Sequence, residues 1–311
     1  MDSLAPIVIF VYNRPQHIRQ TIEALLKNEQ APESDLIIFS DGAKNDPASR
    51  KGVEQTRSYL KTISGFKSVR VIERDNNIGL AGNVIDGVTR IVDEYGKIIV
   101  LEDDLLTSPF FLQFMNEALI KYEKEDKVAS VHGFVYNIKE PLPENFFLRH
   151  ISSWGWGTWV DSWKLFEPNG QKLLDEIEER NLKSLFNFNE SLKFLRMLEQ
   201  QIRGENNSWA VRWYASIFLA GKLSLYPDKS LIFHNGSDSS GSNIGDERWM
   251  DTLLTQHPIR VVDHLPIEES VQARLAYEHF FRSIRIPFKV HVKKKLYKIY
   301  SQFKKKLYRQ H

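Results

Sequence analysis

Three consecutive acidic residues, Glu102, Asp103 and Asp104, directly follow the apolar run 98–101. Such a run is typical of a buried strand, so we expect the carboxylates at the carboxyl end of a sheet, where open α/β sheets bind ligands. Clustered carboxylates are hard oxygen ligands that suit Mg²⁺ or Mn²⁺, and without a cation or hydrogen bonds their like charges would repel. The sequence therefore predicts a divalent-metal site here, with a solvated acidic turn as the alternative.

Two other strand-like runs also end in polar residues. Residues 6–11 precede Tyr12-Asn13-Arg14, and residues 36–39 precede Ser40-Asp41-Gly42. In a parallel sheet these ends share one edge with the acidic triplet. An Asp and an Asn there can hydrogen-bond a nucleobase and a ribose, while a metal-binding carboxylate farther along holds a diphosphate. We therefore predict a nucleoside-diphosphate site without a Walker or dinucleotide fingerprint; separately, Asp41 could be a turn residue and Asn13 a helix N-cap.

The elements that must position these residues alternate between strand and helix patterns in the first half of the chain. Strands are predicted at 6–11, 36–39, 69–72 and 98–101, and helices at 17–27, 53–63 and 80–95. Later segments predict a helix over 109–123, a strand over 128–131, and helices over 172–202 and from 208 to about 221. This alternation favours an α/β fold with a mostly parallel central sheet flanked by helices.

Composition excludes several classes of site. The 311-residue chain is 42% hydrophobic and 26% charged, as is usual for a soluble globular protein. It contains no cysteine, which excludes disulfides, thiolate metal sites and Cys nucleophiles. The first residues carry no basic signal-like region, so we expect no secretory signal, and no apolar run approaches the roughly 18 residues of a membrane span. These features favour a cytoplasmic protein.

The segment 282–311 is strongly basic. It holds 11 of the 42 Lys and Arg residues and none of the 40 Asp and Glu residues. Apolar residues at 292, 296, 299, 303 and 307 fall on one helical face. This pattern predicts a helical C-terminal extension that docks on an anionic membrane surface, at the inner face of the cell membrane. The alternatives are a solvated terminal helix or nonspecific nucleic-acid contact; we expect no specific nucleic-acid partner.

Taken in order, these motifs resemble a glycosyltransferase of the GT-A fold. The resemblance is closest to the N-acetylglucosaminyltransferase I type and to bacterial family-2-like sugar transferases, and it runs from Pro6 to about Asn243. It rests on Ile9 to Pro15, Ser40 to Gly42, Asn77 to Asn83, Val100 to Leu105, Ser108 to Phe111, and Trp154 to Gly157. It implies a transferase domain at 1–250, with a donor half at about 1–107 and an acceptor half at about 108–250. A connecting segment at 251–281 and the basic tail at 282–311 would follow.

The resemblance also implies a donor site. Asp41 would meet the nucleobase, and Asp104 would be the most direct metal ligand. Apart from the resemblance, His234 could be a further metal or phosphate contact, with a satisfied polar histidine as the alternative. The implied donor is a nucleoside-diphosphate sugar, with a UDP-sugar favoured, and the implied cofactor is Mn²⁺ or Mg²⁺. The implied donor-binding residues are Tyr12, Asn13, Arg14, Asp41, Asn77, Gly79, Asn83, Glu102 and Asp103.

The Trp-Gly-Trp-Gly segment offers two interpretations. Trp154 and Trp156 could stack on a sugar ring, while Gly155 and Gly157 would let the backbone approach a substrate closely. Large aromatic residues are also typical of a protein core. We expect the first interpretation for Trp154 and Trp156, and core packing for Trp159 and Trp163.

The catalytic base does not follow from the resemblance. An inverting transferase needs a carboxylate to take the acceptor proton, and related enzymes often carry it inside a Trp-Asp-x-x-Trp-like segment. Here Trp209 to Trp213 contains no acid. Asp238, in a Gly/Ser-rich loop predicted to close on the donor, is our first candidate, and Glu205 is the second. A retaining mechanism without a dedicated base is the alternative.

The sequence thus predicts a metal-dependent, nucleotide-sugar glycosyltransferase of the hexosyltransferase type. We expect a saccharide or lipid-linked saccharide acceptor in bacterial surface-polysaccharide biosynthesis. One alternative is a sugar-nucleotidyltransferase, although such enzymes usually carry a Gly-rich loop after the first strand, and residues 12–17 contain no glycine. The other is a non-enzymatic carbohydrate-binding or membrane-scaffolding module, which would leave the ordered acids at the strand ends unexplained.

Overall fold

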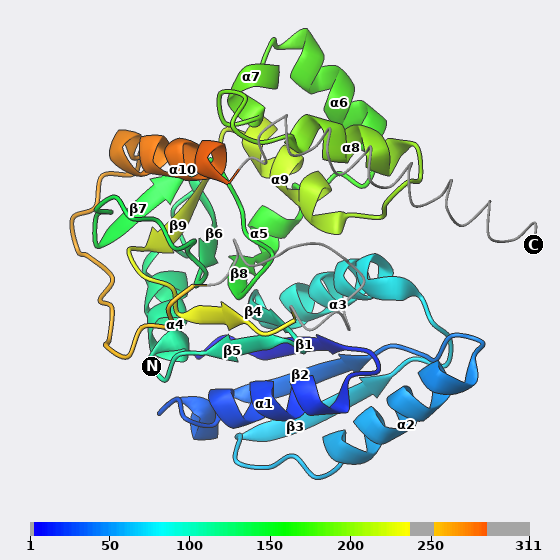
Figure 1. The fold of residues 1–311 in the computed structure, drawn as a ribbon. Coiled ribbons are helices and arrows are strands. Elements are labelled where there is room, and N and C mark those ends of the chain that lie inside the picture. The colour runs from blue at the N-terminus through cyan, green and yellow to red at the C-terminus, as the bar shows by residue number, and fades with distance from the viewer. Residues whose placement is uncertain (1–2, 237–251, 285–311) are drawn as a thin grey trace, which may run out of the picture.

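The computed structural model describes residues 3–236 and 252–284. It is built around an eight-stranded sheet and a separate two-stranded ribbon (Figure 1). The order across the sheet is β3 (Ser68–Glu73), β2 (Asp35–Ser40), β1 (Ile7–Val11), β4 (Lys97–Glu102), β8 (Trp156–Trp159), β6 (Val128–His132), β9 (Leu223–Pro227) and β7 (Asn145–Leu148). The ribbon pairs β5 (Leu105–Thr107) with β10 (Ile232–His234).

The first four strands form a parallel half-sheet. Val11 pairs with Ser40, and Phe10 pairs with Glu102, so the carboxyl ends of β1, β2 and β4 meet at one edge. β1 is buried along its whole length, because helices cover both faces of this half-sheet. The apolar faces of α1 (Pro15–Leu25) and α2 (Pro47–Leu60) pack on one side, and α3 (Gly79–Tyr95) packs on the other.

The second half of the sheet is mixed. β8 runs antiparallel to both β4 and β6, β6 pairs in parallel with β9, and β9 is antiparallel to β7. A helical layer lies above this half in Figure 1. The remaining helices are a 3₁₀ turn at Ala31–Glu33, α4 (Phe111–Lys121), α5 (Val160–Trp163), α6 (Gly170–Glu179), α7 (Lys183–Phe186), α8 (Phe194–Ile202), α9 (Trp209–Leu219) and α10 (Val271–Ser283).

The prediction of an α/β fold with a mostly parallel central sheet is confirmed, with corrections after residue 109. The helical region 172–202 is three helices, because Asn181 and the consecutive residues Phe188 to Glu190 have left-handed backbone conformations, with φ between 49° and 63°. Strands β7 to β10 were not predicted from the sequence, and β7, β8 and β10 have only three or four residues each. Within residues 3–236 and 252–284, no helix is long and apolar enough to cross a membrane. The predicted basic tail lies outside the described residues, apart from its first three positions.

Candidate functional site

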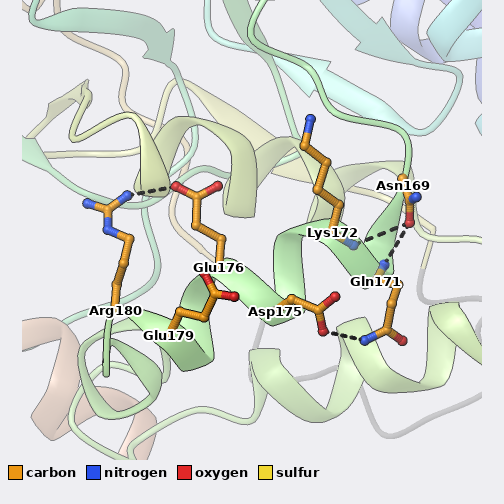
Figure 2. A pocket seen from close by; sticks show the side chains of 7 residues that line it. All are labelled: Asn169, Gln171, Lys172, Asp175, Glu176, Glu179 and Arg180. Atoms are coloured by element: carbon orange, nitrogen blue, oxygen red, sulfur yellow. Dashed lines mark hydrogen bonds and ion pairs between the residues drawn. The ribbon is translucent and has the colours of Figure 1, made fainter.

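One hollow of about 590 Å³ lies on the surface of α6 (Figure 2). Its polar side chains mainly form hydrogen bonds and ion pairs with other residues of the same helix. Asn169 caps the helix by accepting from the backbone N–H groups of Gln171 and Lys172. Arg180 pairs with Glu176, one turn away, at 3.0 Å. Groups that satisfy one another along a single exposed helix are typical of a solvated surface.

A second cavity, of about 480 Å³, opens at the carboxyl edge of the parallel half-sheet. This is the position at which open α/β sheets bind ligands. Its lining comes from the ends of β1, β2 and β4, and from the starts of α3 and α9. The predicted site residues that line this cavity are Tyr12, Asn13, Arg14, Asp41, Asn77, Gly79, Asn83, Glu102, Asp103, Asp104, Trp154 and His234.

At one end of the cavity, Asp41 fixes the loop that leads into α3. Its Oδ1 accepts hydrogen bonds from the backbone N–H groups of Gly42 and Ile78, at 2.8 and 2.9 Å. Its Oδ2 accepts from the Asn77 amide and from the Gly79 backbone N–H, both at 2.9 Å. A carboxylate offers about four lone-pair positions. The Asp41 carboxylate is therefore fully used in holding the loop.

Two arginines that the sequence pattern did not single out support this end. Arg57, from α2, donates to the backbone oxygens of Asp41 and Arg74, at 3.3 and 2.7 Å. Arg74 in turn donates to the side-chain oxygen of Asn83, at 3.1 Å. No sequence signal distinguished Arg57 from a surface charge on an amphipathic helix, because its partners come from distant parts of the chain.

At the other end, Arg14 binds two residues of the acidic triplet. Its Nε lies 3.3 Å from Asp103 Oδ2, a second nitrogen contacts Asp103 Oδ1, and Nη1 lies 2.8 Å from Asp104 Oδ2. Thr21, on α1, donates to the backbone oxygen of Asp103 at 2.7 Å. Asp104 is only 6% exposed, and its Oδ1 has no hydrogen-bond partner among the described residues. This end thus combines a close ion-pair cluster with one unsatisfied carboxylate oxygen.

The acidic end holds more negative charge than Arg14 balances. Burial, with the charges of Asp104 and Asp103, raises the pKa of Glu102 to about 8. Burial also raises the pKa of Asp103 to about 6, although the charge of Arg14 acts in the opposite direction. Burial alone would lower the pKa of Arg14, but the charges of Asp103 and Asp104 outweigh it and raise that pKa. An additional cation would therefore be stabilised here.

His234 lies next to Asp104, as a shared metal site would require. The distance from His234 Nε2 to Asp104 Oδ2 is 3.7 Å, and the Trp154 ring lies 4.9 Å from the His234 ring, centroid to centroid. A Cβ at Gly236 would come within 2.4 Å of Asp104 Oδ2, so the backbone closes tightly over this carboxylate. The described residues contain no group of three or more His, Cys, Asp or Glu side chains arranged for a metal ion. The donor set fits a hard cation that takes its remaining ligands from a substrate's phosphates.

Two predicted residues that the structure describes do not line this cavity. Trp156 is 0% exposed in the core, stacked on Trp209 at 5.4 Å between ring centroids, so it presents no face to a sugar. Glu205 is exposed, does not line the cavity, and pairs with Arg203 at 2.6 Å. Asp238 lies outside the described residues. As expected, Trp159 and Trp163 are buried core residues.

The start of α9 and the residues before it also line the cavity. Asn206 to Ala210 line it, and Ser208 caps the helix by accepting from the Val211 backbone N–H at 3.2 Å. Lys44 also lines the cavity, with its Nζ 5.8 Å from the centre of the Tyr12 ring. Sequence reasoning missed Lys44, because an isolated lysine in a loop carries no signal of its own.

Comparisons with known proteins identify the family. The family described as Glycosyl transferase family 2 matches residues 7–177, which is more than half of the chain. Solved structures with similarity include a mannosyltransferase from Pyrobaculum calidifontis in complex with GDP-Man and Mn²⁺, at 10% identity and a TM-score of 0.35. That alignment covers 56% of this chain and 47% of the mannosyltransferase, about half of its length.

A second similar structure is a UDP-glucose pyrophosphorylase complexed with UDP-glucose, at 9% identity and a TM-score of 0.38. Here the alignment covers 73% of this chain and 91% of the pyrophosphorylase. Curated protein sequences gave no significant match. The family match agrees with the parallel half-sheet and confirms the predicted GT-A fold. The chain belongs to glycosyl transferase family 2.

Proposed function

We propose that this protein is a metal-dependent glycosyltransferase that moves a sugar, of the hexose type, from a nucleoside diphosphate to a saccharide acceptor. One observation carries the proposal. A single cavity at the edge of the sheet has a rigid, hydrogen-bonded loop at one end and a buried acidic cluster at the other. This arrangement suits a donor whose nucleoside lies at the loop and whose diphosphate lies at the acids.

The nucleoside end would act mainly through its backbone. Asp41 contributes to nucleobase recognition by holding residues 77–79 in place, since its own lone pairs are used by that loop. Tyr12 and Asn13 would frame the nucleoside from the end of β1, and Asn83 from α3. Our first choice of donor is a UDP-sugar.

The acidic end would hold the metal. Asp104 is the proposed direct ligand, with His234 beside it and Glu102 and Asp103 orienting the donor sugar and the cation. When bound, Mn²⁺ or Mg²⁺ would offset the negative charge that develops on the departing nucleoside diphosphate. The chain's own contribution is to hold these carboxylates in a buried position, where water screens them little.

The acceptor would approach from the side of Trp154, which is half-buried at the cavity and can offer part of its ring to a sugar. We propose a lipid-linked saccharide in bacterial surface-polysaccharide assembly, with the basic tail binding the inner face of the membrane. Residues 1–250 would then form the transferase domain, with donor and acceptor halves meeting near residue 107. Residues 251–281 would connect this domain to the tail.

Donor use is tested by thermal-shift and hydrolysis measurements. We expect Mn²⁺ together with one nucleoside diphosphate to raise the melting temperature, and the corresponding sugar nucleotide to be slowly hydrolysed. Asp104→Ala should abolish the hydrolysis, whereas Asp161→Ala should not, because Asp161 is an exposed surface residue paired with Lys164. Absence of any response to all common nucleoside diphosphates would contradict the proposal. Formation of a nucleoside triphosphate from sugar nucleotide and pyrophosphate would instead favour a nucleotidyltransferase.

Membrane docking is tested separately with the full chain. Co-sedimentation with vesicles containing anionic phospholipid should be strong, and weak with neutral vesicles. Changing the six lysines at 293–295 and 304–306 to glutamine should reduce binding to the anionic vesicles. Equal binding of both proteins would exclude the tail as the membrane anchor.

A further inference from the structure

Arg14 is the cation that the protein itself supplies to the acidic end of the cavity. Its guanidinium contacts Asp103 with two nitrogens and Asp104 with a third. The three side chains are only 16%, 5% and 8% exposed, respectively. In such a buried setting charged hydrogen bonds are strong, and water screens them little.

The position of Arg14 in the chain fixes its backbone but leaves its side chain able to move. It is the third residue after β1 and directly precedes Pro15, the first residue of α1, so the nearby strand and helix hold its Cα. Its side chain makes no capping hydrogen bond to α1. The guanidinium is thus held at the carboxylates by their charge and could turn to a different anion nearby.

Arg14 contacts three of the four carboxylate oxygens that Asp103 and Asp104 could offer to a divalent cation, and only Asp104 Oδ1 is left without a partner among the described residues. Asp104 Oδ2 lies 2.8 Å from Arg14 Nη1 and faces His234 Nε2 at 3.7 Å. A cation that binds more than Asp104 Oδ1 must therefore weaken or replace the contacts of Arg14. In the absence of a donor, the released guanidinium would remain buried without a partner, which is costly.

A nucleoside diphosphate changes this balance. Its phosphates would lie next to the acidic cluster, and a planar guanidinium binds phosphate oxygens in pairs as well as it binds carboxylates. Arg14 could then exchange its carboxylates for phosphate while the metal takes the carboxylates. The diphosphate gives the displaced guanidinium a new partner, and the metal neutralises the carboxylates that Arg14 leaves. Each ligand thus lowers the free-energy cost of binding the other, which is positive coupling between two binding events.

We propose that Arg14 is an internal competitor of the metal that couples metal binding to donor binding. In the donor-free protein it holds Asp103 and Asp104 and weakens the binding of free Mn²⁺. With a nucleoside diphosphate present, the same side chain turns to the phosphates and Mn²⁺ binds tightly. This inference rests on the proposed function, because it requires a diphosphate donor in this cavity.

The test is a Mn²⁺ titration of the full chain, followed by calorimetry or by the EPR signal of free Mn²⁺. Wild type, Arg14→Gln and Arg19→Gln are each titrated alone and with a saturating nucleoside diphosphate. Arg19 is a matched control, because it is an exposed arginine on α1 and its guanidinium stacks on the Tyr59 ring. Without nucleotide, we expect Arg14→Gln to bind Mn²⁺ about tenfold or more tightly than wild type, as loss of competing charged hydrogen bonds implies. Arg19→Gln should match wild type.

The coupling gives a second readout. Nucleoside diphosphate should strengthen Mn²⁺ binding markedly in wild type and much less in Arg14→Gln. If Arg14→Gln is poorly folded, Arg14→Lys, which keeps the charge but loses the paired donors, should show an intermediate Mn²⁺ affinity. Mn²⁺ should also raise the melting temperature of either variant more than that of wild type.

Unchanged or weaker Mn²⁺ binding by donor-free Arg14→Gln would overturn the role of Arg14 while leaving the proposed metal site intact. Failure of wild type to bind Mn²⁺ even with bound nucleotide would count instead against metal dependence. In that case a gain of Mn²⁺ binding in Arg14→Gln would still support competition, and no gain would overturn it.

Discussion

The substitution Asp41→Asn tests whether Asp41 acts through the loop that it holds. It keeps the size and shape of the side chain but replaces one oxygen by an NH₂ group. In the structure all four groups that point at the carboxylate are donors, two on each oxygen. Whichever way the new amide is oriented, its NH₂ group faces two donors. Two of the four hydrogen bonds are therefore lost.

The magnitude follows from these two bonds. A hydrogen bond to a charged group contributes about 1.5–3 kcal/mol net, and Asp41 is only 4% exposed, so water cannot readily replace the lost partners. Because the loop can relax, we expect a loss near the lower end, about 3 kcal/mol of unfolding free energy. Relaxation is limited at Gly42, where an added Cβ would come within 2.3 Å of the Asn76 backbone.

The matched comparison is Asn77→Ala. It removes one of the four bonds to Asp41, together with the bond from the same amide to the Gly42 backbone oxygen, and leaves the carboxylate intact. Asn77 is partly exposed, so we expect a cost of only about 1 kcal/mol. Urea denaturation of wild type and the two variants gives the unfolding free energies, and calorimetry with several nucleoside diphosphates gives the affinities.

Two results would refute this reasoning. One is an unfolding free energy of Asp41→Asn within about 0.5 kcal/mol of wild type, which is the usual effect of a surface substitution. The other concerns the nucleobase. If Asp41 acts through the loop, all nucleoside diphosphates should weaken by a similar factor, whereas a direct contact would change their order of preference.

Three further outcomes are expected. Trp156→Ala should lower the unfolding free energy by about 3–5 kcal/mol, as large core truncations do, whereas Trp154→Ala should raise the acceptor KM with a smaller stability loss; urea denaturation and steady-state kinetics check both. Burial lowers the pKa of His150 to about 3 and that of His132 well below its ordinary value. Both histidines therefore stay neutral in the native state, whereas they take up protons in the unfolded state. The unfolding free energy should fall as pH drops below about 6.5, by up to about 1.4 kcal/mol per pH unit for each histidine. His150→Gln should flatten this pH dependence in urea titrations. Asp238→Asn should abolish transfer to the acceptor while nucleoside-diphosphate affinity, measured by calorimetry, is retained.

The side of the cavity formed by the sheet edge could be predicted, because buried parallel strands are plain in the sequence. Residues 7–11 and 36–39 are buried without interruption and are continuous apolar runs, and the next polar residue marks the edge of the sheet. The hydrogen-bond partners of the polar residues at the sheet edge could not be predicted in the same way. The four donors to Asp41 come from its own neighbour and from residues 36 to 38 positions later, a contact that no local pattern encodes.

Trp154 and Trp156 show a second limit. Two residues apart in a regular strand, they would point to the same face of the sheet, which made them equivalent in the sequence. Gly155 has a φ of 62°, and an added Cβ there would lie 2.4 Å from Ile232 Cγ1. The chain therefore turns at Gly155 before β8 begins, leaving Trp154 at the cavity and Trp156 in the core.

The two ends of the cavity differ in how their charges are satisfied, and this difference favours an order of events. All lone pairs of the Asp41 carboxylate are used by its own loop, so a nucleoside bound there would meet a surface that needs little rearrangement. At the other end Asp104 Oδ1 has no partner among the described residues, and its other oxygen is held by Arg14. A nucleoside could therefore bind the loop before any metal is present. Its diphosphate would then replace the carboxylates as the partner of Arg14. We therefore expect the metal to be the last component to bind tightly, because Arg14 and the carboxylates all have partners of opposite charge only when a donor is bound.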